Sequence, residues 1–201
     1  AWGKGAKPGP RIGWVQEGLR WWDYWRKGVD TGIMDEPVLT AWMQDYVPPA
    51  HQYEKRPGHW VTEPMWPSPN IENQSLWLGK NSLELNSVNE DALNQSSLET
   101  CGAFAGDWCP YGYSGEMPLD QRLDDGSALN FDSAPLEAPI DLLGAPVLEA
   151  QITVDQEVAF IAVWLSDISP DGAATRLTYG LLNLNHLDGH ASPRNIAPAE
   201  T

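Results

Sequence analysis

The chain has 201 residues, enough for a hydrophobic core and for one large domain or one domain plus part of another. Its formal net charge of −16 comes from the part after residue 30, because the first 30 residues hold six Lys and Arg against three Asp and Glu. So acidic a surface repels phosphate backbones and anionic lipids, and we therefore expect no nucleic-acid or membrane partner.

The sequence contains no apolar run long enough to span a membrane and no recognisable leader peptide, so we expect a soluble, cytoplasmic protein. Cys101 and Cys109 are too few for a disulfide scaffold, and their spacing fits no common zinc motif. Two free thiols are the prediction, with no metal and no cofactor.

The first element in chain order is a helix over Ile12–Lys27, ended by Gly28. Its apolar residues recur at helical spacing and form two adjoining stripes, one of Ile12, Val15, Leu19 and Trp22 and the other of Trp14, Trp21 and Trp25. An indole buries about 150 to 250 Å². This helix therefore needs a large partner, and none is obvious within the chain.

Val38–Tyr46 is predicted to be a mostly buried strand, ended by Pro48 and Pro49. Residues 50–73 are rich in proline and tryptophan and are expected to form an ordered but irregular connection.

Two short strands are expected next, at Leu76–Leu78 and Ser82–Leu85. Residues 86–100 are polar and suit a surface loop or one short helix. Cys101–Met117 is dense in glycine and aromatic residues, which favours a loop that covers apolar surface.

Three apolar runs between Asp120 and His186 predict a β-sandwich. Leu148–Val154 alternates as a half-buried strand does, and Val158–Leu165 is apolar on both parities, as expected of a central core strand. The turn Ser169–Gly172 predicts a hairpin between this strand and Thr175–Leu184. The expected fold class is mainly β.

No catalytic set is recognisable. Gly112–Gly115 misses the Gly-x-Ser-x-Gly spacing of a nucleophile elbow. His186 and His190 are four apart, but the intervening Gly189 favours solvated turn histidines over metal ligands. Asp124-Asp125-Gly126 could supply a carboxylate pair or a calcium site, although a turn is the more frequent meaning.

Resemblance to a known family goes further. The segments LRWWDYWRKGVDTGIMDEP (residues 19–37) and LDDGSALNFDSAPLEAPIDLLGAPV (residues 123–147) carry it. Over residues 10–190 the chain resembles the C-terminal part of X-Pro dipeptidyl-peptidases and cocaine-esterase-like (CocE/NonD) serine hydrolases.

In that family, a jelly-roll sandwich of galactose-binding-like shape packs on an α/β-hydrolase domain that carries a Ser-Asp-His triad. The resemblance implies that residues 1–75 are the tail of the hydrolase domain plus a connector, and that 76–201 are an incomplete jelly roll. The triad would precede residue 1, and closing strands would follow Thr201. An unpaired sheet edge is then expected beside Thr175–Leu184.

The resemblance implies the C-terminal part of a peptidase or esterase, inactive alone, whose partner is the missing hydrolase domain. Peptide or ester substrates would bind only the full-length protein. Phe104 and Trp108 are candidate substrate-pocket walls, although packing in the interdomain seam is the alternative. The rival functions are a stand-alone carbohydrate- or partner-binding sandwich, and a fragment that self-associates through unpaired strands into a homo-oligomer.

Overall fold

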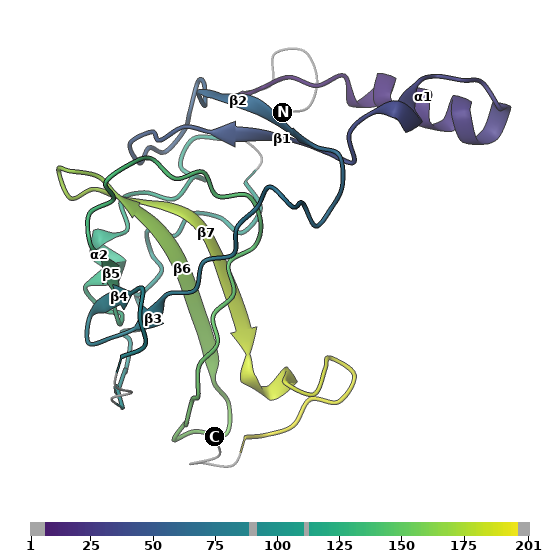
Figure 1. The fold of residues 1–201 in the computed structure, drawn as a ribbon. Helices are drawn as coiled ribbons and strands as arrows, with labels where there is room; N and C mark the ends of the chain where they lie inside the picture. The colour runs from purple at the N-terminus through teal and green to yellow at the C-terminus, as the bar shows by residue number, and fades with distance from the viewer. Residues whose placement is uncertain (1–6, 89–91, 111–112, 197–201) are drawn as a thin grey trace.

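The computed structural model describes residues 7–88, 92–110 and 113–196 and is mainly β, as predicted (Figure 1). Its longer elements are one helix and two antiparallel strand pairs. In chain order the elements are α1 (Trp14–Lys27), the 3-10 turn η1 (Ile33–Asp35), β1 (Leu39–Gln44), β2 (Gly58–Glu63), β3 (Trp77–Leu78), β4 (Ser82–Glu84), α2 (Arg122–Asp125), β5 (Asp132–Ser133), β6 (Phe160–Ile168), β7 (Ala174–Asn183) and η2 (Leu184–His186). No helix among the described residues is long and apolar enough to cross a membrane.

Helix α1 forms where the aromatic stripes predict it and projects away from the other elements (Figure 1). Gly28 ends it in a left-handed conformation (φ +69°), with its amide bonded to the Tyr24 carbonyl at 3.1 Å. None of the helix residues is buried, and Trp21 and Trp25 are 45% and 54% exposed with ring centroids 5.7 Å apart. The helix thus presents its apolar face to solvent.

The segment after α1 is tied back to the helix through Arg20. Its guanidinium donates to Glu17 at 2.7 Å, to the Thr31 carbonyl at 3.3 Å and to Glu36. The Thr31 hydroxyl donates in return to the Arg20 carbonyl at 3.2 Å. These bonds hold the segment that follows Gly28 against helix α1.

Strands β1 and β2 form an antiparallel pair. β2 corrects the expectation of an irregular connection over residues 50–73: the prolines bracket this strand and do not interrupt it. Trp42 and Trp60 lie opposite each other, with ring centroids 5.2 Å apart in an edge-on contact. Gly58 permits the close approach, because a Cβ there would lie 2.0 Å from the Met43 carbonyl oxygen.

Strands β3, β4 and β5 form a small sheet in that order. β3 and β4 pair antiparallel close to the predicted positions, and β5 pairs with β4 in parallel. No helix or strand forms in the described part of 86–100. Of the two structures expected there, a surface loop or a short helix, the loop is observed.

Strands β6 and β7 form the predicted hairpin across the Ser169–Gly172 turn, where the Gly172 amide bonds to the Ser169 carbonyl at 2.8 Å. The expectation that the first strand is a core strand is wrong, since Phe160 is 72% exposed. Within the described residues β6 and β7 pair only with each other, and no residue of β6 is buried. The far edge of β7 has no partner strand there, as expected.

The predicted strand over Leu148–Val154 is not formed. This stretch has the alternation of a strand but belongs to none of the described strand pairs, and its residues are mostly exposed. Alternation indicates which way side chains face, but a strand also needs a partner.

Burial is concentrated in two small clusters at the ends of β7. One contains Ala173 and Ala174 with the polar side chains of Gln121, Asp124 and Thr175, and the other contains Leu184, Asn185 and Ile196. The chain exposes 15546 Å² in total. A compact monomer of 22.2 kDa exposes about 9,400 Å². Much apolar surface is therefore open to a partner.

Candidate functional site

The best-organised region lies where α2 meets the start of β7. The Gln121 amide donates to the Ala174 carbonyl at 3.1 Å, and the Ala174 amide donates to the Asp120 carboxylate at 3.1 Å. On β6, the Trp164 indole donates to the Asp125 carboxylate at 2.9 Å. These bonds fix the short helix against both strands of the hairpin.

Two buried side chains hold the loop 101–119, whose residues 111 and 112 lie outside the described part. They are Asp124 of α2 and Gln121, the residue just before α2. The Asp124 carboxylate accepts the amide of Gly102 at 2.9 Å and that of Phe104 at 3.0 Å. The Gln121 side chain donates to the carbonyls of Phe104 at 2.8 Å and Leu119 at 2.6 Å. The local sequence Asp-Gln-Arg-Leu-Asp-Asp therefore organises the loop that precedes it, reaching back as far as Gly102.

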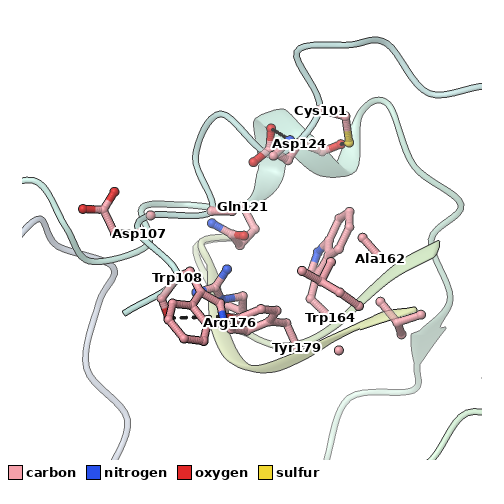
Figure 2. Close-up of a pocket in the computed structure, with 15 residues that line it drawn as sticks. Cys101, Asp107, Trp108, Gln121, Asp124, Ala162, Trp164, Arg176 and Tyr179 are labelled. Atoms are coloured by element: carbon pink, nitrogen blue, oxygen red, sulfur yellow. Dashed lines mark hydrogen bonds between the residues drawn. The ribbon is translucent and has the colours of Figure 1, made fainter. Parts of the chain in front are cut away.

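A pocket of about 280 Å³ lies between this loop and the β6–β7 hairpin (Figure 2). Gln121 and Asp124 lie on its α2 side, and the hairpin side chains lie opposite them (Figure 2). The strand register explains the hairpin wall: Trp164 pairs with Tyr179 and Ala162 pairs with Leu181, so these four side chains share one face of the sheet.

Arg176 is the cation of this pocket. Its guanidinium carbon lies 4.4 Å from the centroid of the Tyr179 ring, a cation–π contact. The Tyr179 hydroxyl reaches the Trp108 carbonyl at 3.4 Å, which joins the hairpin to the loop. Burial lowers the pKa of Arg176, and the structure describes no carboxylate paired with it.

Two further groups near the pocket have altered pKa values. Burial raises the pKa of Asp125, although the bond from Trp164 works in the opposite direction. Burial also raises the pKa of the Cys101 thiol, and the charges of Asp124 and Asp125 add to that effect. The thiol therefore stays protonated near neutral pH and is a poor nucleophile.

The arrangement suits the binding of a ligand that has both apolar and polar groups. Its walls combine indole, phenol, guanidinium and amide groups, and no histidine or serine is among its lining residues. Cys101 and Cys109 are unpaired in the structure. Among the described residues, no group of three or more His, Cys, Asp or Glu side chains could hold a metal ion.

Of the two site residues predicted from sequence, Trp108 lines this pocket and Phe104 does not. Trp108 lines it and is 83% exposed, whereas Phe104 contributes only backbone bonds to the structure around it. Whether either residue meets a substrate stays a prediction. Trp164, Arg176 and Tyr179 were missed, although the Ser169–Gly172 hairpin turn implies a register that could have brought them together.

Other predicted motifs lie elsewhere or serve the fold. Asp124 and Asp125 belong to helix α2 instead of a simple turn. His186 and His190 lie together, with ring centroids 5.0 Å apart, and His186 ends the 3-10 turn η2. Gly112 of the Gly112–Gly115 segment lies outside the described residues.

Comparison with known proteins gives a consistent result. The family described as "X-Pro dipeptidyl-peptidase C-terminal non-catalytic domain" matches residues 31–201. A protein of Mycobacterium bovis and one of Mycobacterium tuberculosis, each named "Putative serine esterase", are 28% identical to this chain over 192 residues. That alignment covers 91% of this chain and 29% of each relative, so the chain spans less than a third of their length.

No solved structure matches the chain. The family match spans most of the sequence, including β1 to β7 and both walls of the pocket. The chain therefore belongs to the family of X-Pro dipeptidyl-peptidase C-terminal non-catalytic domains.

Proposed function

We propose that this chain is the C-terminal part of a serine hydrolase of dipeptidyl-peptidase or acyl-esterase type, and that it packs on the catalytic domain and helps to shape its active site. The family is non-catalytic by description, and two relatives bear the name of serine esterases. The absence of a catalytic set from the pocket lining agrees with a supporting role.

The observation that carries this proposal is the apolar surface left open. The total exposed surface, polar and apolar together, exceeds that of a compact monomer by about 6,000 Å², and a standard interface buries about 800 Å² on each partner. Large apolar side chains such as Trp14, Trp22 and Trp25 are among the exposed residues. Helix α1 concentrates this surface, since none of its residues is buried. A hydrolase domain is a partner large enough to cover it.

We further propose the division of the chain at residue 75. In this arrangement α1, β1 and β2 belong with the hydrolase domain and its connector, and residues 76–201 form a galactose-binding-like jelly roll. In support, β1 and β2 pair only with each other within the described chain, and β6 and β7 have free edges that additional strands would pair.

A cytoplasmic location is part of the same proposal. Cys101 and Cys109 are unpaired, and Cys109 is exposed, as is usual for proteins kept in a reducing compartment.

The experiment labels the native protein with a fluorophosphonate probe, which reacts with activated serines, and detects it with an antibody raised against this chain. The expected product is a labelled species about three times the 22.2 kDa of the chain, because the chain matches 29% of each relative. The purified chain alone should remain unlabelled and should not cleave p-nitrophenyl esters. A native species of about 22 kDa that resists the probe would refute the proposal.

Trp108 is the residue of this chain that we propose for a wall of the substrate cleft, with Phe104 fixing the loop behind it. In the complete enzyme, Trp108→Ala is expected to lower kcat/KM about 10-fold for bulky acyl groups and less for small ones, since an exposed indole supplies apolar contact. The measurement compares kcat/KM across acyl substrates of graded size. Equal effects on all of them would indicate that Trp108 only packs in the interdomain seam.

A further inference from the structure

We propose that the pocket between the loop 101–119 and the β6–β7 hairpin binds a small molecule that carries a carboxylate on a flat, mainly apolar body. Arg176 holds the carboxylate, and Trp164 and Tyr179 contact the body. The inference does not rest on the proposed hydrolase function, because every lining residue belongs to this chain.

Arg176 is the cationic side chain among the residues that line the pocket. The Tyr179 ring covers one face of its guanidinium, with 4.4 Å between the guanidinium carbon and the ring centroid. The N–H donors in the plane of the guanidinium therefore remain for a ligand. A stacked guanidinium with a free edge matches the planar, bidentate geometry of a carboxylate.

The surroundings of Arg176 make its lack of an acidic partner informative. The chain holds 28 Asp and Glu against 12 Lys and Arg, so an arginine has many acids available. Arg122 and Arg194 are paired with Asp120 and Asp188. Arg176 and Arg56 are both partly buried with no carboxylate paired to them in the described chain, but of the two it is Arg176 that lines the pocket, and burial lowers its pKa. A bound carboxylate would offset that cost.

The acids that line the pocket do not oppose an anionic ligand. Both oxygens of Asp124 accept the amides of Gly102 and Phe104, so this carboxylate is directed at the backbone of the loop. The carboxylate of Asp107 points away from Arg176 (Figure 2).

The remaining walls favour an apolar body. Besides the three aromatic residues Trp108, Trp164 and Tyr179, the lining contains the aliphatic residues Ala105, Ala162, Val163 and Leu181. The volume of about 280 Å³ lies at the lower limit of ligand pockets, which begin at about 300 Å³. An aromatic acid or the C-terminal residue of a peptide has the required size and chemistry.

The test measures binding to the folded chain by isothermal titration with two matched pairs of probes. Indole-3-acetate and indole-3-acetamide represent a free aromatic acid and its neutral amide, and N-acetyltryptophan and its amide represent a peptide terminus. The acid of at least one pair is expected to bind about 10-fold more tightly than its amide, and the pair that does so identifies the source of the carboxylate.

Substitution assigns the effect to the pocket. Arg176→Gln should abolish the preference for the acid, and Arg176→Lys, which keeps the charge but not the planar fork, should reduce it. Arg56→Gln is the matched control, because Arg56 stacks on Tyr53 at 4.6 Å outside the pocket, and it should leave binding unchanged. Circular dichroism verifies that each variant is folded. If Arg176→Gln does not fold, Arg176→Lys alone tests the role of Arg176.

Three results would overturn the inference. The first is equal binding of acid and amide in both pairs, and the second is no binding of either acid to the folded chain. The third is a preference for the acid that is unchanged in both Arg176 variants, or that Arg56→Gln abolishes as completely as Arg176→Gln does.

Discussion

Asp124→Ala is expected to destabilise the chain by about 2 to 4 kcal/mol, because it leaves the amides of Gly102 and Phe104 without acceptors in a region where Asp124 is only 4% exposed. Urea unfolding measures the loss, and amide hydrogen exchange locates it. Protection should fall first at Gly102 and Phe104. The Cys101 thiol should also react faster with a disulfide reagent, since Asp124 helps to raise its pKa.

Two variants control for this effect. Asp107→Ala removes a carboxylate from the same loop where it is exposed, and it should change stability by no more than about 0.5 kcal/mol. Asp124→Asn keeps one of the two acceptor oxygens and should lose an intermediate amount. If Asp124→Ala and Asp107→Ala are equally stable, Asp124 does not hold the loop.

The double variant Trp21→Ser, Trp25→Ser is expected to weaken association with the catalytic domain at least 30-fold while leaving the fold of the chain intact. The two indoles are 45% and 54% exposed in the chain, so little packing is lost within it. At an interface, aromatic residues of this kind contribute about 2 kcal/mol or more, which corresponds to about 30-fold in Kd. Titration calorimetry between the chain and its separately produced catalytic domain measures the change.

Gln16→Ser is the matched control, because Gln16 lies on the opposite, polar face of α1 and is exposed. Its Kd should stay within about 2-fold of the starting value. Should the double variant instead convert a dimer of this chain to a monomer, with unchanged affinity for the catalytic domain, the aromatic face would be a self-association surface.

The elements that could be predicted from sequence are those specified by local signals. Helix α1 follows from its aromatic periodicity and from Gly28, which supplies the left-handed end. The β6–β7 hairpin follows from two apolar runs joined by the Ser169–Gly172 turn.

The errors came from interactions between distant parts of the chain. Leu148–Val154 has good strand alternation but joins none of the described strand pairs, whereas β2 lies among prolines and forms by pairing with β1. The exposure of β6 has the same cause. An apolar run indicates that a strand prefers burial, but burial requires other parts of the molecule to pack on it.

The candidate site was only partly predictable for a related reason. Trp108 stood out by composition, but Arg176 is 68 positions away and reaches the pocket through the pairing of β6 with β7. The role of Asp124 could not be predicted because Asp-Asp-Gly usually indicates a turn, while here the carboxylate accepts the amides of Gly102 and Phe104, 22 and 20 residues upstream.

The Arg20 bridge has a consequence for the speed and cost of assembly. Because its guanidinium bonds to Thr31 and Glu36, the segment between α1 and β1 is tied to the helix across Gly28. A surface that is already ordered loses less conformational freedom on binding, where each immobilised flexible side chain otherwise costs about 0.5 to 1.5 kcal/mol. The aromatic face would then meet its partner by simple collision and fit, without a folding step that limits the rate.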